Sequence, residues 1–403
     1  MTVEIRRPEE DELRSSMEAA LTAFAESTEE ADWERESKSV RLERAVAAYD
    51  DGRPVGFSAS YEFELTVPGG GSVPTAGVTW VGVMPTHRRR GILRSFMEQL
   101  FEDARANGEP LAALYASEAA IYGRFGYGVA THWLDLNAES RRIVFRDDPV
   151  PGGIVRLVEE DEAYERFPQI YERLRTARPG MLSRSEHWWR RHRLADYEHR
   201  RQGASRRFNA LLELDGDPAA YAVYRVKEDW DEGYPRGEVR LVEAFATSPE
   251  STRELWRYLF NIDLTTRVKC GLFDPASPLF LMVADPRALH LKVFDGMWLR
   301  LVDVEEALRR RSFAGDDAVV LEVRDATYPE NDGRYRAGST IERTDDEADV
   351  ALDVADLASA YLGAFSFERL ASAGRAEELR EGGLERASAL FRTPLPPYCP
   401  EVF

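Results

Sequence analysis

Cysteine and long apolar runs are both scarce in this chain of 403 residues. The two cysteines, Cys270 and Cys399, are far apart, so we expect no disulfide framework and a reducing compartment. No stretch approaches the ~20 consecutive apolar residues of a membrane span. The first residues, Met1–Arg7, are charged and have no apolar run behind them. We therefore expect no signal peptide, no membrane partner and a cytoplasmic location.

Nucleotide-binding and metal-binding motifs are also missing. The chain contains neither G-x-G-x-x-G nor G-x-x-x-x-G-K-[ST], the Gly-rich fingerprints of dinucleotide and nucleoside triphosphate sites. The six histidines show no spacing typical of metal ligands. His187 and His192 are the nearest pair, but they lack an H-E-x-x-H pattern or cysteine partners. We expect no metal.

Positive charge is outnumbered by negative charge. The formal net charge is −19, which argues against a general nucleic-acid binder. The run Trp188–Arg193 is therefore interpreted as a helix that packs two tryptophans between domains, in preference to a nucleic-acid surface. The acidic surplus suits a cationic substrate, but solvated surface charge is the simpler explanation.

The most informative stretch that is present runs from Val81 to Gly91. An apolar segment, Thr79–Val83, predicts a strand, and three arginines and Gly91 follow it. Apolar residues at i, i+3, i+4, i+7 and i+8 then predict a helix over 92–104. The free N–H groups and the dipole at its start favour an anion, and glycine lets a ligand approach closely. We interpret the loop as a pyrophosphate cradle, although many strand–turn–helix units with arginines bind nothing.

The chain length predicts two or three domains. In the first we expect a strand over 2–7, a helix opening at Pro8, a helical stretch over 28–39, a hairpin of 46–49 and 55–61, and a buried strand over 111–116. Strands on both sides of the 92–104 helix indicate a mixed α/β layer, with the cofactor cleft at the strand ends.

Two segments in this region carry a family resemblance. Arg88-Arg89-Arg90-Gly91-Ile92-Leu93 resembles the [RQ]-x-x-G-x-[GA] signature of the GCN5-related N-acetyltransferases (GNAT), which hold the pyrophosphate of acetyl-CoA; Leu93 departs from the pattern. The segment 116–128, Ala-Ser-Glu-Ala-Ala-Ile-Tyr-Gly-Arg-Phe-Gly-Tyr-Gly, resembles the second signature. Together they resemble the Eis (enhanced intracellular survival) branch, whose members acetylate aminoglycosides. Chain length and the terminal aromatic residue agree with that branch.

The resemblance implies two tandem GNAT-type domains, over 1–145 and 146–294, and a sterol-carrier-like α/β domain over 295–403. Within the second range, Ile154–Glu162 echoes Val3–Asp11, and the 211–221 segment echoes the first hairpin. Thr247–Ser251 stands where the first copy has its basic loop. We expect a duplicated fold whose second copy is degenerate and has lost the acetyl-CoA site; chance similarity is the alternative. Four prolines and several large apolar residues predict an ordered tail over 391–403.

Roles for individual residues follow from the resemblance. The backbone of Val81 and Val83 would hold the pantetheine arm. Arg88, Arg89 and Gly91 would bind the pyrophosphate, and Ser117 would contact the cofactor on its far side. Tyr122 matches the general acid that protonates the CoA thiolate, and a phenol with pKa ~10 stays protonated at pH 7. A core aromatic is the alternative, with Tyr127 as the reserve acid. The base would be the C-terminal carboxylate of Phe403; the alternative is an inert packed tail.

The substrate pocket is the least legible part of the sequence. Phe24, Glu26, Trp33 and Glu401 are candidates for an aromatic and acidic wall suited to a polyamine. The expected activity is acetyl-CoA-dependent transfer to amines such as aminoglycosides, at more than one position. A protein-lysine or polyamine acetyltransferase, or a non-catalytic acetyl-CoA sensor or lipid carrier, are the alternatives. The resemblance also implies a homo-oligomer, a hexamer.

Overall fold

The computed structural model describes residues 3–27, 30–149 and 153–403. The chain forms two units. The first combines Met1–Thr131, Met297–Pro397 and Val402–Phe403, and the second combines His132–Gly296 and Tyr398–Glu401.

The larger sheet of the first unit has seven strands in the order β1-β2-β3-β4-β5-β16-β6. They are β1 (Glu4–Arg6), β2 (Ala45–Asp50), β3 (Arg53–Thr66), β4 (Ser72–Val83), β5 (Leu111–Tyr115), β16 (Met297–Leu301) and β6 (Gly128–Val129). Neighbouring strands are antiparallel except for β4 and β5, which are parallel. The hairpin expected over 46–61 is β2 and β3.

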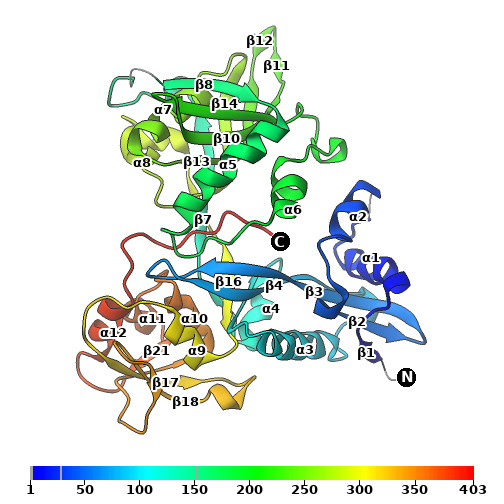
Figure 1. Cartoon of the computed structure of the whole chain (residues 1–403), viewed down its shortest axis with the longest axis vertical. Helices are drawn as coiled ribbons and strands as arrows, with labels where there is room; N and C mark the ends of the chain where they lie inside the picture. The colour runs from blue at the N-terminus through cyan, green and yellow to red at the C-terminus, as the bar shows by residue number, and fades with distance from the viewer. Residues whose placement is uncertain (1–2, 28–29, 150–152) are drawn as a thin grey trace. The chain divides into compact units, whose positions relative to one another are not determined.

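Two helices cover opposite faces of this sheet (Figure 1). On one face, α1 (Leu13–Ala23) packs on β3 and β4, and a Cβ atom on Gly82 would overlap Ala20. On the other face, α3 (Ile92–Ala106) buries the apolar stripe that its sequence spacing predicts. Two short helices complete this part, α2 (Glu30–Glu36) and α4 (Ala119–Tyr122). The helix expected over 28–39 is therefore shorter in the structure, and Thr28 lies outside the described residues.

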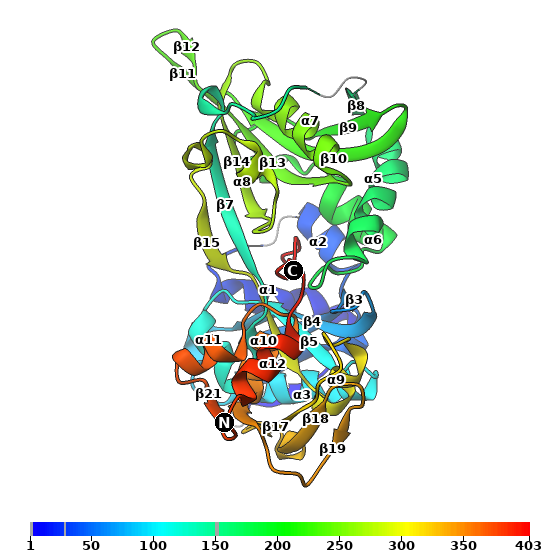
Figure 2. The ribbon, with the colours of Figure 1, turned by 90° about the vertical axis from the view of Figure 1, so that its left-hand side faces the viewer.

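The rest of the first unit is a smaller layer of strands and helices (Figure 2). Its sheet has the order β19-β18-β17-β20-β21, with β17 (Val319–Arg324), β18 (Gly333–Ala337), β19 (Glu342–Arg343), β20 (Val350–Asp353) and β21 (Ala376–Glu378). Its helices are α9 (Val304–Arg310), α10 (Val354–Tyr361), α11 (Phe367–Ser372) and α12 (Gly383–Phe391). All eight residues of α10 are buried, because it packs on this sheet and also on β16 and β6 of the larger one.

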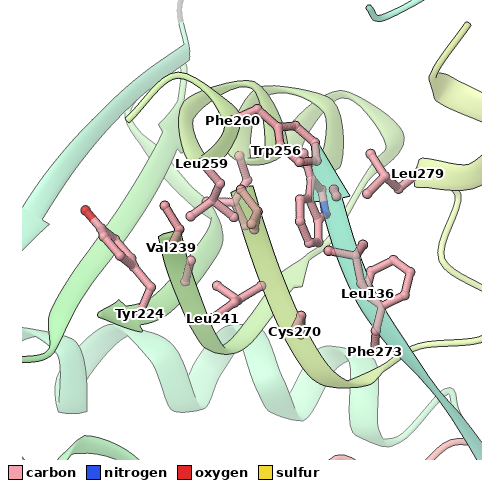
Figure 3. Close-up of a cluster of buried hydrophobic side chains, with 14 of the residues drawn as sticks. Leu136, Tyr224, Val239, Leu241, Trp256, Leu259, Phe260, Cys270, Phe273 and Leu279 are labelled. Carbon is pink, nitrogen blue, oxygen red and sulfur yellow. The ribbon is translucent and has the colours of Figure 1, made fainter. Parts of the chain in front are cut away.

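The second unit contains another seven-stranded sheet, in the order β15-β7-β14-β13-β10-β9-β8. Its strands are β7 (His132–Glu139), β8 (Gly153–Val158), β9 (Phe208–Leu214), β10 (Asp217–Lys227), β13 (Gly237–Ala246), β14 (Thr265–Phe273) and β15 (Lys292–Asp295); β11 (Trp230–Asp231) and β12 (Tyr234–Pro235) pair separately. Its helices are α5 (Glu160–Arg175), α6 (Glu186–Trp188), α7 (Pro249–Phe260) and α8 (Leu279–Met282). From α7, Trp256, Leu259 and Phe260 point onto β13, β14 and β7 (Figure 3).

The start of α7 differs from the start of α3. The Ser248 side chain accepts a hydrogen bond from the N–H of Ser251, and the Ser251 hydroxyl accepts from the N–H of Ser248. This reciprocal cap occupies N–H groups that a phosphate would otherwise use. The second copy therefore has a self-capped helix where the first has an uncapped one.

Two strands cross the domain limits expected from the sequence, at 145/146 and 294/295. β7 precedes the first limit but pairs in the sheet of the second unit, and β16 follows the second limit but pairs with β5 and β6 in the first unit. The limits themselves remain predictions, and part of the expected linker, 150–152, lies outside the described residues. Trp188 and Trp189 are buried, and a π-helical turn over Trp189–Leu194 follows α6.

Candidate active site

The two parallel strands of the first unit separate partway along their length. β4 and β5 pair from Thr75–Leu111 to Gly77–Ala113, but β4 continues to Val83 and β5 to Tyr115. Beyond Gly77 the facing strand edges no longer bond to each other. Backbone groups on these edges are free to hold a ligand that enters between the strands.

A β-bulge lies on the open part of β4. Phe57 and Ala59 of β3 pair with Gly82 and Thr79, so β4 has one residue more than β3 in this interval. Within the bulge, Trp80 has a φ of +57°, a left-handed conformation that is unfavourable for a bulky residue. Bulges of this kind redirect the backbone next to active sites. The residue redirected here is Val81.

The basic loop follows β4 and is held from one side. His87 Nε2 lies 3.0 Å from an oxygen of Asp50, and Arg90 lies 3.5 Å from the same oxygen. Arg88 and Arg89 are exposed and form no ion pair with any part of the chain that the structure describes. Two cations are therefore available to a ligand, while the loop that carries them is anchored at the end of β2.

The loop ends at the start of α3. Gly91 is the N-cap, with a φ of +86°, and no side chain caps the helix there. A Cβ atom on Gly91 would meet no atom within 4 Å. The space in front of the first N–H groups of α3 is therefore open. Uncapped amides, the helix dipole and free guanidinium groups together form a site for an anion such as a phosphate.

A pocket of about 690 Å³ joins these parts. All six residues predicted to bind the cofactor line it: Val81, Val83, Arg88, Arg89, Gly91 and Ser117. Tyr122 and Phe24 line it as well. Other residues that line the pocket are not predicted from the sequence: Ala23, Gly82, His87, Ile92, Leu93, Arg94, Glu118, Ile121, Arg124 and Phe125. Arg124 could have been chosen, because it lies within the second quoted motif.

Tyr122 lies at the end of α4 with only 5 % of its surface exposed. Burial, and to a smaller extent the nearby Glu118 carboxylate, raises the pKa of Tyr122 to about 12. The phenol therefore stays protonated and can act as a proton donor throughout the neutral range. Tyr127, the reserve candidate, is fully buried, packs edge-to-face on Tyr122, and is not among the pocket-lining residues.

Phe403 lies where β4 and β5 separate. Its ring centre is 5.0 Å from that of Phe63 and 6.1 Å from that of Tyr115. A Cβ atom on Gly77 would lie 3.2 Å from Phe403 Cε2. The ring therefore packs across β3, β4 and β5, at the last paired residues of the two parallel strands. Phe403 therefore lies where the two strands separate, but it is not among the residues that line the pocket.

The four candidate substrate residues have different environments. Phe24 lines the pocket and is exposed, and Glu26 is exposed but does not line it. Trp33 on α2 is half-buried, with the Arg14 guanidinium 5.4 Å from its ring centre. The structure therefore brings Phe24 together with the cofactor residues, but not Glu26 or Trp33.

Glu401 has a different role from the predicted one. It is fully buried in the second unit, where one carboxylate oxygen accepts from Arg184 Nε at 2.5 Å. The other accepts from Trp188 Nε1 at 2.8 Å and from Arg193. Both oxygens are already used by protein cations and an indole. We therefore replace the predicted substrate contact with a structural role for Glu401.

Two kinds of feature are absent from the residues that the structure describes. Over residues 3–27, 30–149 and 153–403, no group of three or more His, Cys, Asp or Glu side chains could hold a metal ion. Within the same ranges, no helix has both the length and the apolar character needed to cross a membrane.

Comparisons with known proteins identify the class. Residues 4–130 and 180–301 each match an acetyltransferase (GNAT) domain, and residues 304–400 match a sterol carrier protein domain. The fold is thus two GNAT domains followed by a sterol-carrier-like domain, as the sequence predicted. A crystal structure from Anabaena variabilis titled a GCN5-related N-acetyltransferase shares this fold, with a TM-score of 0.85 at 19 % identity and full coverage of both chains.

Closer relatives identify the family. The chain is 38 % identical to an N-acetyltransferase of Streptomyces avermitilis, over the whole of both chains. It is 35 % identical to N-acetyltransferase Eis of Mycobacterium tuberculosis, with 98 % of each chain covered. The crystal structure of Eis1 from Mycobacterium abscessus has a TM-score of 0.88 at 33 % identity, with both chains fully covered. The chain belongs to the Eis family of GNAT N-acetyltransferases, and it is an N-acetyltransferase.

Proposed function

We propose that this protein transfers the acetyl group of acetyl-CoA directly to primary amines of polyamine-type substrates such as aminoglycosides, at several positions. The observation that carries the proposal is the single pocket lined by Val81, Val83, Arg88, Arg89, Gly91, Ser117 and Tyr122. This pocket combines the unpaired edge of β4, the anion site at the start of α3 and the protonated phenol of Tyr122. These are the parts that a thioester with a pyrophosphate tail requires.

The residues present fit acetyl-CoA on structural grounds. The open space at Gly91, the uncapped start of α3 and the available Arg88 and Arg89 suit a pyrophosphate. The unpaired edge of β4 beyond Gly77 suits the amide groups of a pantetheine arm. In the proposed arrangement, the backbone of Val81 and Val83 holds that arm and polarises the thioester carbonyl.

Two groups transfer the protons, the C-terminal carboxylate of Phe403 and the phenol of Tyr122. The Phe403 carboxylate accepts a proton from the substrate ammonium, directly or through one water molecule. The free amine attacks the carbonyl carbon, and the C–S bond breaks as Tyr122 donates its proton to the leaving thiolate. The attacking nitrogen loses its second proton as the amide forms, and this proton restores the Tyr122 phenol. A C-terminal carboxylate has an ordinary pKa of ~3.3–3.7, so it is a weak base in water. Burial of the carboxylate beside the substrate, or a relay through one water molecule, would make it a better base.

The substrate class rests on charge and on the family. An exposed aromatic, Phe24, lines the pocket, and the chain carries a formal net charge of −19. Such an environment attracts a molecule with several ammonium groups. Relatives at 35 % identity carry the name Eis, and the sequence resemblance connects that family with aminoglycosides. We further propose that the protein is cytoplasmic and forms a homo-oligomer, a hexamer. Light scattering of the purified protein tests the oligomeric state.

The experiment measures CoA release from acetyl-CoA with three kinds of acceptor: aminoglycosides, linear polyamines and lysine-containing peptides. Four proteins are compared. They are the wild type, a chain lacking Val402 and Phe403, Phe403→Ala, and the wild type with one glycine appended. Phe403→Ala keeps the carboxylate but loses the ring, whereas the appended glycine keeps the ring and moves the carboxylate.

We expect aminoglycoside turnover by the wild type and a loss of ~100-fold or more in kcat on truncation and on glycine addition, with acetyl-CoA affinity retained. Phe403→Ala should lose less. Equal activity of all four proteins would place the base elsewhere. Preferred turnover of peptides would favour a protein-lysine acetyltransferase, and binding of acetyl-CoA without turnover of any amine would favour a sensor.

A further inference from the structure

The left-handed conformation of Trp80 needs support from its surroundings. A φ of +57° costs a bulky L-residue about 1–2 kcal/mol relative to an ordinary strand conformation. Strained residues of this kind persist only where neighbouring contacts hold them. Trp80 immediately precedes Val81, so the support for Trp80 also fixes the backbone that faces the pocket.

The support visible in the structure is a chain of hydrogen bonds. Trp80 Nε1 donates to the Tyr61 hydroxyl at 3.2 Å, and that hydroxyl donates to Glu36 Oε2 at 2.9 Å. The other carboxylate oxygen of Glu36 pairs with Arg35 at 2.5 Å, and Arg35 also pairs with Asp32 at 3.0 Å. The chain therefore runs from the bulge of β4, through β3, to helix α2.

Burial makes these contacts strong. Tyr61 and Glu36 are each 7 % exposed, and Arg35 is 4 % exposed. Burial raises the pKa of Tyr61 well above its usual value, so its hydroxyl keeps the proton that it donates. A buried donor or acceptor that loses its partner costs about 1–3 kcal/mol, so each link holds the next one in place.

We propose that Tyr61 and Glu36 are positioning residues for acetyl transfer, which fix the Trp80 bulge and thereby aim the Val81 backbone at the thioester. The inference rests on the proposed function only for the identity of the ligand. Trp33, a candidate amine contact, lies on the same helix as Glu36. The chain of contacts thus ties α2 to the Val81 backbone.

The test is a double-mutant cycle between Tyr61→Phe and Trp80→Gly. Tyr61→Phe removes both hydrogen bonds and keeps the ring. Glycine adopts a left-handed conformation without strain, so Trp80→Gly frees the bulge from its dependence on Tyr61. Tyr49→Phe is the matched control: Tyr49 is also buried in the first unit, and its hydroxyl lies 3.1 Å from both Ser16 and Glu12. Glu36→Gln keeps an acceptor for the Tyr61 hydroxyl but removes the charge that pairs with the buried Arg35.

Three quantities are measured: kcat, the acetyl-CoA Kd, and the amide hydrogen-exchange rate of the segment 78–84. We expect Tyr61→Phe to lower kcat ~10-fold and to accelerate exchange in this segment, and Glu36→Gln to act in the same direction. Tyr49→Phe should change both quantities by less than ~3-fold. In the Trp80→Gly background, Tyr61→Phe should have no further effect on kcat or exchange.

An equal effect of Tyr61→Phe in both backgrounds, or one no larger than that of Tyr49→Phe, would overturn the proposal. Failure of the proposed function looks different. If the wild type binds acetyl-CoA without turning over any amine, the Kd and the exchange rates still decide the role of Tyr61. If acetyl-CoA does not bind at all, the exchange rates alone decide it.

Discussion

Gly126 lies directly against the guanidinium group of Arg300. A Cβ atom on Gly126 would overlap Nη1 of Arg300, lie 2.8 Å from its Cζ and lie 2.9 Å from Val354 Cγ1. Arg300 cannot move aside easily, because it is fully buried and ion-paired with Asp325. Gly126 also has a φ of +81° and ends the turn that follows Tyr122. Arg300 on β16 and Val354 on α10 thus support the turn that follows the proposed acid.

Replacing Gly126 with alanine should therefore destabilise the protein strongly. The new methyl group combines overpacking with a left-handed backbone, and we expect a loss of about 3 kcal/mol in unfolding free energy. Gly123→Ala is the control, because Gly123 has a φ of −56° and a Cβ there would meet no atom within 4 Å. That variant should be neutral or slightly stabilised. Urea unfolding measures both, and similar losses in the two variants would contradict the packing argument.

The two free arginines of the loop should contribute separately to acetyl-CoA affinity. Arg88→Gln and Arg89→Gln should each raise the Kd about 5- to 10-fold, since each removes one charge-assisted contact with the pyrophosphate. Arg90→Gln is the control, because Arg90 is already paired with Asp50. Titration calorimetry gives the Kd values.

The same variants should bind acetyl-pantetheine, which lacks the pyrophosphate, as the wild type does. A loss of affinity for this shorter thioester would mean that the arginines act through the shape of the loop and not through the phosphates.

Tyr122→Phe should lower kcat by ~100-fold and leave the acetyl-CoA Kd unchanged, because it removes only the proton donor. With a pKa of about 12, Tyr122 remains protonated up to about pH 11, so it should not cause an alkaline decline of kcat below that pH. An aryl thioester, whose thiolate is a better leaving group, should narrow the difference between variant and wild type.

Tyr127→Phe is the matched control for this prediction. The Tyr127 hydroxyl is buried and makes no hydrogen bond with any described residue, so its removal should leave kcat unchanged. A decline as large as that of Tyr122→Phe would make Tyr127 the better candidate for the acid.

Local patterns explain which features the sequence could predict. The apolar spacing of 92–104 predicts α3 closely, because a helix is determined by residues within a few positions of one another. Arg88, Arg89, Gly91, Ser117 and Tyr122 are likewise predicted from contiguous motifs, and all five line the pocket. β4, however, begins at Ser72, whereas the sequence predicts a strand only from Thr79. The first half of β4 lacks an apolar run, so no local pattern indicates it.

Features that depend on distant partners could not be predicted. No local signal marks Trp80 as a bulge residue, because tryptophan rarely adopts a positive φ and its support comes from Tyr61. The pairing of β16 with β5 joins segments almost two hundred positions apart. The sequence does not predict the burial of Glu401, because its partners, Arg184 and Arg193, are more than 200 positions away.

The buried Glu401 cluster should make stability depend on acid. Burial alone disfavours the Glu401 carboxylate, but the guanidinium groups of Arg184 and Arg193 outweigh burial and lower its pKa from 4.5 to about 2. The folded state therefore binds this proton less tightly than the unfolded state does. The stabilisation is fully present above pH 4.5 and is lost as the pH falls toward 2, by about 3 kcal/mol in total.

Glu401→Gln should remove this dependence and lower stability at pH 7 by about 3 kcal/mol, because it leaves Arg193 buried without its carboxylate. The control is Glu165→Gln, an exposed position on α5 of the same unit. Thermal unfolding between pH 2.5 and 7 is the measurement. The wild type and Glu165→Gln should lose stability steeply below pH 4.5, and Glu401→Gln should lose less. Parallel curves for all three proteins would show that Arg184 and Arg193 do not stabilise the charged form of Glu401, and acid unfolding would then have to arise from other carboxylates.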